Sequence, residues 1–169
     1  ITNEKEILGL GGVIGGESSS ISLDTKNIFL ESALFDPVKI SKIAKKLGIN
    51  SDAKFRFERG VDPNIMEYGL KLAAKIINKL CGGKISNITI SGESNFKNKQ
   101  IKFNSDQFEK IIGSKISSTE IKKILDNLGF KFKESKNAYI INVPTWRPDI
   151  NEEVDIVEEL IRIRGYDKI

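Results

Sequence analysis

The sequence predicts an α/β fold of the α+β type, built from two small modules that meet near residue 92. Segments with apolar residues at helical spacing begin at capping residues and end at glycines, as helices do. Short alternating or continuous apolar runs lie between these segments, as strands do. The 169 residues are enough for one large domain or two small ones, each with a modest core.

The first module, residues 1–92, is predicted to open with strands and turns over residues 7–35. Pairs of glycines flank a short apolar stretch in "ILGLGGVIGGESSS", and "NIFLESALF" is a run of the buried-strand type. The glycine-rich segment 9–16 lacks the Gly-Lys-Ser/Thr of a phosphate-binding loop and the spacing of a dinucleotide fingerprint. A tight strand connection that uses positive φ is therefore the favoured interpretation.

Two helices are predicted to follow, each beginning at an Asp-Pro pair, because proline is favoured at the first helical position. The first runs from its cap Asp36 to Gly48, and the second opens at Asp62–Pro63 and stops at Gly82–Gly83. The predicted inward faces are formed by Ile40, Ile43, Ala44 and Leu47 in the first helix and by Met66, Leu70, Ala73, Ile77 and Leu80 in the second.

The segment between these helices, "SDAKFRFERGVDP", is dense in charge and is predicted to be a loop or a short strand. In a strand, alternation would place Phe55 and Phe57 on one face and the charged residues on the other. Arg56 and Arg59 could contact phosphate, although a solvated face with local ion pairs is the commoner explanation. A short strand, "ISNITI", precedes the polar, turn-rich "SGESNFKNKQ", which is the predicted domain boundary.

The second module, residues 93–169, is more regular. A strand, "IKFN", is followed by a short helix, "SDQFEKIIG", which ends at Gly113. A second helix, "SSTEIKKILDNLG", begins with a capping box of Ser117 and Glu120 and ends at Gly129. The run "FKFKESKNAYIINVP" alternates around a polar turn, as a hairpin does. Two short helices followed by a hairpin indicate a winged-helix-like module.

The C-terminal stretch "WRPDINEEVDIVEELIRIRGYDKI" is acidic, although the chain carries a net charge of +4. Six acidic residues and no basic one lie between Asp149 and Glu159. Pro148 and Asp149 suit a helix start, and Glu152 is placed to complete a capping box. Asp155, Glu158 and Glu159, at positions i, i+3 and i+4, are then predicted to share one face of the helix.

These carboxylates admit three interpretations from the residues alone. Together with Asp149, which is able to fold back, they could ligate a hard cation such as Mg²⁺. They could equally meet a basic partner surface, or Arg162 and Arg164 one turn further on. The macrodipole explains acidic residues in the first turn, such as Glu152 and Glu153, but its effect weakens deeper in the helix, where like charges four apart repel. From the residues alone a solvated face is nevertheless slightly favoured.

Composition excludes several classes of site. The chain has no histidine, which removes imidazole bases and histidine-ligated zinc, and its one cysteine, Cys81, fits a reducing, cytoplasmic setting. No apolar run approaches the roughly 20 residues that a membrane span needs, and the N-terminus lacks a signal-peptide layout. Without the six C-terminal acids, the rest of the chain has a surplus of ten positive charges, which suits a polyanionic partner.

Four motifs in this order resemble the bacterial phenylalanyl-tRNA synthetase beta subunit family: "GGVIGGESS", "NIFLESALFDPVKI", "SDAKFRFERGVDP" and "VPTWRPDINEEVDIVEELIRIRGYDKI". The likeness covers nearly the whole chain. It implies that residues 1–92 are the C-terminal part of an editing (B-three/B-four) domain and that residues 93–169 are a B-five domain. It also implies a cytoplasmic (αβ)₂ tetramer with an alpha subunit, which uses ATP and Mg²⁺ to attach phenylalanine to tRNA(Phe), without a membrane.

The resemblance assigns roles to particular residues. It implies that Mg²⁺, shared with the alpha subunit, is bound by Asp149, Asp155, Glu158 and Glu159. It further implies an editing pocket, which hydrolyses tyrosine mischarged onto tRNA(Phe), at Gly15, Glu31, Ser51 and Ala53. In that pocket Glu31 would accept the tyrosyl hydroxyl, and the glycine would allow close backbone approach. Ser51 stands where the family usually has threonine and Lys54 where it often has serine. The resemblance also implies that the N-terminal half of the editing domain is not among these residues, so a complete pocket is not expected within them.

Two other functions are compatible with the residues alone. A free-standing winged-helix module that binds nucleic acid would need a basic recognition helix, and the candidate helix offers only Lys122 and Lys123. A carboxylate-metal hydrolase of phosphoesters would need metal-dependent turnover that is lost on Asp155→Asn.

Overall fold

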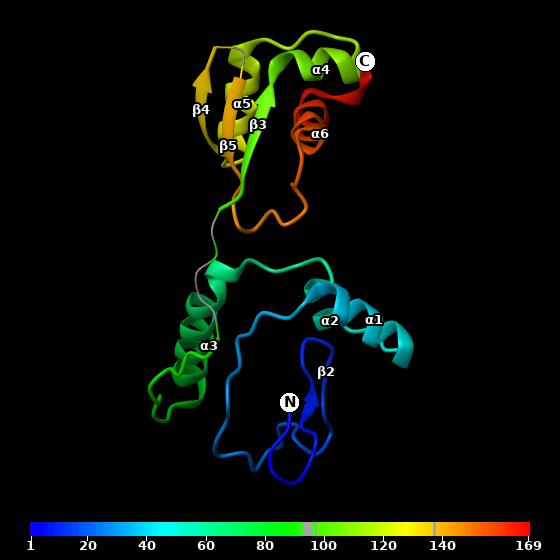
Figure 1. Ribbon diagram of the computed structural model, residues 1–169. Helices are drawn as coiled ribbons and strands as arrows, with labels where there is room; N and C mark the ends of the chain where they lie inside the picture. The colour runs from blue at the N-terminus through cyan, green and yellow to red at the C-terminus, as the bar shows by residue number, and fades with distance from the viewer. Residues whose placement is uncertain (93–95, 97, 137) are drawn as a thin grey trace. The chain divides into compact units, whose positions relative to one another are not determined.

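The computed structural model describes residues 1–92, 96, 98–136 and 138–169. Two compact units make up the chain, Ile1–Ser94 and Asn95–Ile169, and each is described by itself (Figure 1). Helices and small antiparallel sheets occur together, which confirms the predicted α+β class. The predicted boundary after residue 92 falls at residues 93–95, which lie outside the described residues.

A two-stranded antiparallel ribbon opens unit 1, formed by β1 (Gly9–Leu10) and β2 (Ile14–Gly15). The connection passes through Gly12 at a φ of 70°, which confirms the tight, positive-φ turn predicted for the glycine-rich segment. Val13 in this turn forms the buried core of unit 1 together with two residues of the next helix, Ile40 and Ala44.

Helix α1 (Pro37–Leu47) begins and ends as predicted. The Asp36 carboxylate accepts hydrogen bonds from two backbone N–H groups of the first turn, and Gly48 ends the helix in the left-handed conformation. Of the four residues predicted to face inward, Ile40 and Ala44 are buried, whereas Ile43 and Leu47 are exposed.

The prediction of a loop or strand after α1 is wrong, because Asp52–Phe57 forms a short helix, α2. Ser51 caps it by accepting a hydrogen bond from the backbone N–H of Lys54. The two aromatic side chains therefore do not share a face. Phe57 packs edge-on against Phe35, with ring centroids 5.1 Å apart, while Phe55 is exposed.

The strands predicted at residues 27–35 and 85–90 are also wrong, since neither range contains a strand. Within the first range Phe29 is 94% exposed, so its apolar side chain has no cover from the described part of unit 1. The predicted second helix is confirmed in its position. A 3₁₀ turn, η1 (Pro63–Ile65), leads into α3 (Met66–Cys81), which ends at Gly82 without a fully buried residue.

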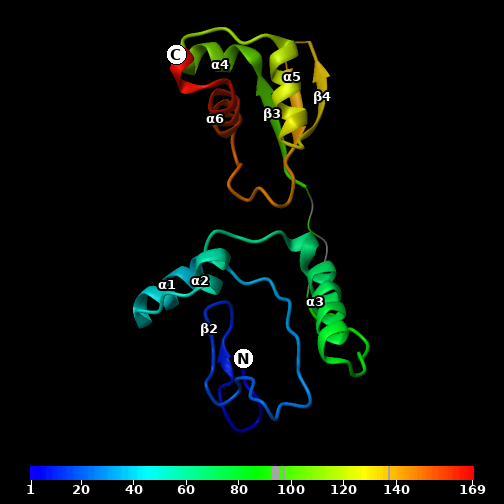
Figure 2. The same cartoon turned by 180° about the vertical axis from the view of Figure 1, so that it is seen from behind.

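Unit 2 holds a three-stranded antiparallel sheet in the order β3-β5-β4, with helices packed on it (Figures 1 and 2). Its strands are β3 (Gln100–Asn104), β4 (Lys131–Ser135) and β5 (Ala138–Asn142). Its helices are α4 (Ser105–Ile112), α5 (Ser118–Asn127), α6 (Glu153–Arg164) and the 3₁₀ turn η2 (Tyr166–Lys168). The predicted strand, two helices and hairpin are confirmed.

Alternating strand residues build the core of unit 2. Ile101 and Phe103 of β3 and Tyr139 and Ile141 of β5 are buried against apolar residues of the three helices. Helix α6 begins at Glu153, so the predicted start at Pro148–Asp149 is wrong. The reason is that Glu152 is the cap and forms the capping box with Asp155.

Candidate functional site

A cavity of about 460 Å³ lies in unit 1. The β1–β2 ribbon, residues 31–35, α2 and the start of α3 contribute to its lining. Three of the four residues predicted for the editing pocket, Gly15, Glu31 and Ala53, line this cavity together although they are far apart in the sequence. The structure therefore brings these three residues around one concave space.

The fourth residue, Ser51, does not line the cavity but supports its wall. Its hydroxyl donates to the backbone carbonyl of Val13 and accepts from the N–H of Lys54. Ser51 thereby ties the start of α2 to the ribbon that carries Gly15. Asp62, which the sequence indicated only as a helix cap, also lines the cavity and supplies a second carboxylate there.

Gly15 and Gly16 of the ribbon differ in the space around them. A Cβ atom added at Gly15 would meet no atom within 4 Å, whereas one added at Gly16 would lie 2.7 Å from the carbonyl oxygen of Leu8. Gly16 is thus required by the packing of the chain itself. The packing does not explain the glycine at position 15.

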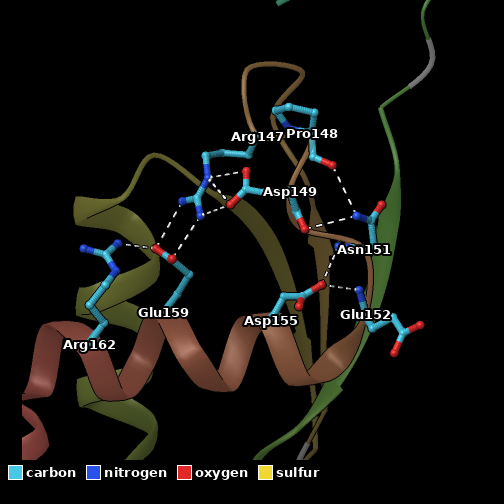
Figure 3. A network of polar contacts seen from close by, with 8 residues as sticks. All are labelled: Arg147, Pro148, Asp149, Asn151, Glu152, Asp155, Glu159 and Arg162. Carbon is cyan, nitrogen blue, oxygen red and sulfur yellow. Dashed lines mark hydrogen bonds and ion pairs between the residues drawn. The ribbon is translucent and has the colours of Figure 1, made fainter. Parts of the chain in front are cut away.

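The acidic C-terminal stretch of unit 2 forms a network around one guanidinium (Figure 3). Arg147 Nε donates to Asp149 Oδ1 at 2.9 Å, and Arg147 Nη2 donates to Glu159 Oε1 at 2.9 Å. Arg147 Nη1 also reaches Glu159 Oε2 at 3.1 Å, which makes the Arg147–Glu159 pair bidentate. Arg162, one turn along α6, donates to the same carboxylate. Only 5% of Glu159 is exposed.

The charges of this network keep both carboxylates ionised. Hydrogen bonds from Arg147 lower the pKa of Glu159 despite its burial, and Arg162 adds to the effect. Hydrogen bonds from Arg147 likewise lower the pKa of Asp149. The two carboxylates in turn raise the pKa of Arg147, so the guanidinium is a permanent cation between them.

The other two predicted metal ligands lie outside this network. Asp155 Oδ2 accepts from the backbone N–H groups of Asn151, at 2.6 Å, and Glu152, at 2.8 Å, and so closes the N-terminus of α6 (Figure 3). Glu158 is exposed and forms no hydrogen bond or ion pair with the described residues.

As arranged, the four carboxylates do not fit a shared metal ion. Within the described ranges no three acidic, cysteine or histidine residues converge as metal ligands would. The cation that Asp149 and Glu159 surround is Arg147. This role of Arg147 has no signal in the sequence, because Arg147 is twelve residues from Glu159 and no local periodicity links them.

Comparison with known proteins places each unit in a domain family. Residues 1–82 match the family model of the B3/4 domain, and residues 101–166 match that of the tRNA synthetase B5 domain. None of the helices in the described residues has the length and apolar character that a membrane crossing requires.

The whole chain aligns with curated relatives. It is 40% identical to the phenylalanine–tRNA ligase beta subunit of Rhodopseudomonas palustris and 41% identical to that of Bartonella quintana, over 100% of this chain and 21% of each relative. The chain thus spans about a fifth of the length of these relatives. A solved N-terminal fragment of the phenylalanyl-tRNA synthetase beta-subunit from Pyrococcus horikoshii is 25% identical to this chain. The match covers 43% of this chain and 21% of the fragment, with a TM-score of 0.39.

Proposed function

Since the chain belongs to the phenylalanine–tRNA ligase beta subunit family, of which it carries a B3/4 and a tRNA synthetase B5 domain, we propose that it serves as a segment of such a subunit. The observation that carries the proposal is about 40% identity along all 169 residues to relatives of that name. The whole enzyme would charge tRNA(Phe) with phenylalanine in the cytoplasm, using ATP and Mg²⁺. Its partners would be an alpha subunit, in an (αβ)₂ tetramer, and tRNA(Phe).

Within this enzyme we assign the cavity of unit 1 to editing. Its volume of about 460 Å³ suits a small ligand such as an aminoacyl group. Glu31 provides a carboxylate acceptor, which distinguishes a tyrosyl hydroxyl from the ring edge of phenylalanine. The open space beside Gly15 allows the aminoacyl group to approach the backbone. The segment itself is not expected to aminoacylate, because we assign the adenylate-forming site to the alpha subunit.

Glu31→Ala in the full-length enzyme is expected to lower the hydrolysis of Tyr-tRNA(Phe) roughly 10- to 100-fold, the value of one hydrogen bond to a charged group. Phenylalanylation should stay largely intact, because Glu31 would contact only the misacylated product. The two rates are measured with purified Tyr-tRNA(Phe) and with phenylalanine, ATP and tRNA(Phe). Glu17→Ala, an exposed position outside the cavity lining, is the control. Equal loss of both activities would refute the role of Glu31.

Mg²⁺ binding by Asp149, Asp155, Glu158 and Glu159 stays a prediction for the assembled enzyme. Arg147 holds two of these carboxylates and the cap of α6 uses a third, so the segment alone is expected to bind Mg²⁺ only weakly. Titration calorimetry of the isolated chain checks this expectation. Submillimolar affinity would show that the carboxylates can leave their protein partners without the alpha subunit.

The two alternative functions have less support. In the winged-helix alternative, Lys122 would have to face nucleic acid, but it forms an ion pair with Glu134 at 2.5 Å. A carboxylate-metal hydrolase would need converging acidic ligands, and the described residues provide none.

A further inference from the structure

The solvent-facing side of α1 carries four lysines, Lys39, Lys42, Lys45 and Lys46, which we name the lysine row. All four are exposed, and the helix contains no acidic residue. None of their side chains forms an ion pair or hydrogen bond within the described part of the chain. An ordinary solvated helix face mixes both signs of charge, so this face is unusual.

Helical geometry places the row opposite the core. Ile40 and Ala44 are buried on one side of α1. At 3.6 residues per turn, Lys39, Lys42 and Lys46 form a stripe on the other side, with Lys45 beside it. The stripe extends over about 10 Å, since each residue adds about 1.5 Å.

Stabilisation of the helix explains only part of the row. Lys45 and Lys46 lie in the last turn, where cations are favoured by the macrodipole. Lys39 lies in the first turn, where a cation is unfavourable, and like charges three and four residues apart repel. The cap carboxylate of Asp36 offsets part of the cost at Lys39, but no acidic residue of α1 itself faces Lys42. An external anion would offset the remaining cost.

We propose that the lysine row binds the phosphate backbone of the RNA whose aminoacylated end enters the cavity of unit 1. This inference rests on the proposed function. Lysine provides flexible point charges, which suit phosphates without reading sequence. The row and the cavity share one support, because Ile40 and Ala44 pack on Val13, and Val13 lines the cavity. A strand held by the row is therefore held at a fixed position relative to the cavity.

The test uses the full-length beta subunit assembled with its alpha subunit and a tRNA(Phe) transcript as the probe. The triple variant Lys39→Gln/Lys42→Gln/Lys46→Gln is expected to raise Kd and to lower the slope of log Kd against log salt by about two, the value for three phosphate contacts on a single strand. Lys39→Arg/Lys42→Arg/Lys46→Arg, which keeps the charges, should keep the slope.

The control removes the same number of charges from α3, through Lys71→Gln/Lys75→Gln/Lys79→Gln. Its salt slope is expected to match the wild-type value. If both glutamine variants change the slope equally, or neither does, the lysine row is not the binding surface. If the unsubstituted enzyme does not bind the transcript at all, the proposed function fails together with this inference. Binding by the unsubstituted enzyme with an unchanged slope in the α1 variant overturns this inference alone.

Discussion

Arg147→Met is expected to destabilise unit 2 by about 3–5 kcal/mol, the cost of removing one partner from a buried ion pair. The substitution keeps most of the side-chain volume but leaves the carboxylate of Glu159 with Arg162 as its remaining cation. Since Glu159 is buried, its charge cannot recover the lost interaction from water. The loop from Pro144 to Asn151 would also lose the contact of Arg147 with α6 and would keep that of Asn151 with Asp155.

Urea unfolding followed by tryptophan fluorescence measures this effect. Trp146, the single tryptophan of the chain, lies beside Arg147 and within van der Waals distance of a Cβ built on Gly129, so its emission reports on unit 2. The double variant Arg147→Met/Glu159→Leu is the matched control. It should regain most of the lost stability because no buried charge is left without a partner: Asp149 and Arg162, which lose theirs, are exposed to water. A double variant as unstable as the single one would show that packing of Arg147, and not its charge, supports the loop.

The stability of Arg147→Met also tests whether Mg²⁺ can replace Arg147 between the carboxylates of the predicted metal site. If Arg147 is the cation that Asp149 and Glu159 require, Mg²⁺ should not restore stability to Arg147→Met in the isolated chain. Part of the acidic stretch would then serve to stabilise the fold of unit 2. This role accounts for Asp149, Asp155 and Glu159 by contacts within the chain and leaves Glu158 as the carboxylate without such a contact.

Apart from the start of α6, the elements of unit 2 could be predicted from the sequence because their signals are local. The capping serine Ser117, the glycine at 113 and the alternation around the hairpin each act within a few residues. In unit 1 the Asp-Pro helix starts were equally local and were confirmed. The strand predicted at 27–35 failed because a continuous apolar run identifies a strand only when another strand pairs with it, and pairing is not a local property. Helix α2 was missed because alternation over six residues fits a strand as well as a helix capped at Ser51.

The geometry of the candidate sites likewise depends on contacts between distant residues, which local sequence signals do not reveal. The geometry that gathers Gly15, Glu31 and Ala53 around one cavity depends on contacts between segments far apart in the chain, and the sequence could suggest it only through family resemblance. The bidentate contact between Arg147 and Glu159 had no sequence signal, since it joins a loop to the middle of a helix.

Gly12→Ala is expected to destabilise unit 1 by about 2–4 kcal/mol, through left-handed backbone strain and overpacking together. Gly12 has a φ of +70°, and an added Cβ would lie 2.7 Å from Phe35 Cδ2 and 2.8 Å from Ile40 Cδ1. Both side chains belong to the small core beneath the cavity, where few buried residues share the strain. Hydrogen exchange should therefore show lost protection in the β1–β2 turn and in α1, while Trp146 fluorescence in unit 2 should remain native.

Gly48→Ala separates the two causes of the loss. Gly48 has a similar φ of +66°, but an added Cβ would meet nothing within 4 Å, so this variant carries only the backbone strain of about 1–2 kcal/mol. A larger loss for Gly12→Ala than for Gly48→Ala would therefore measure the cost of crowding Phe35 and Ile40. Equal losses of stability would mean that the core of unit 1 can rearrange to accommodate a methyl group. A cavity wall that rearranges so easily could not hold Glu31 at a fixed position relative to Gly15. The rigidity of this small core is thus a condition for the editing role. The pair of glycine variants tests it while Gly15, Glu31 and Ala53 remain unsubstituted.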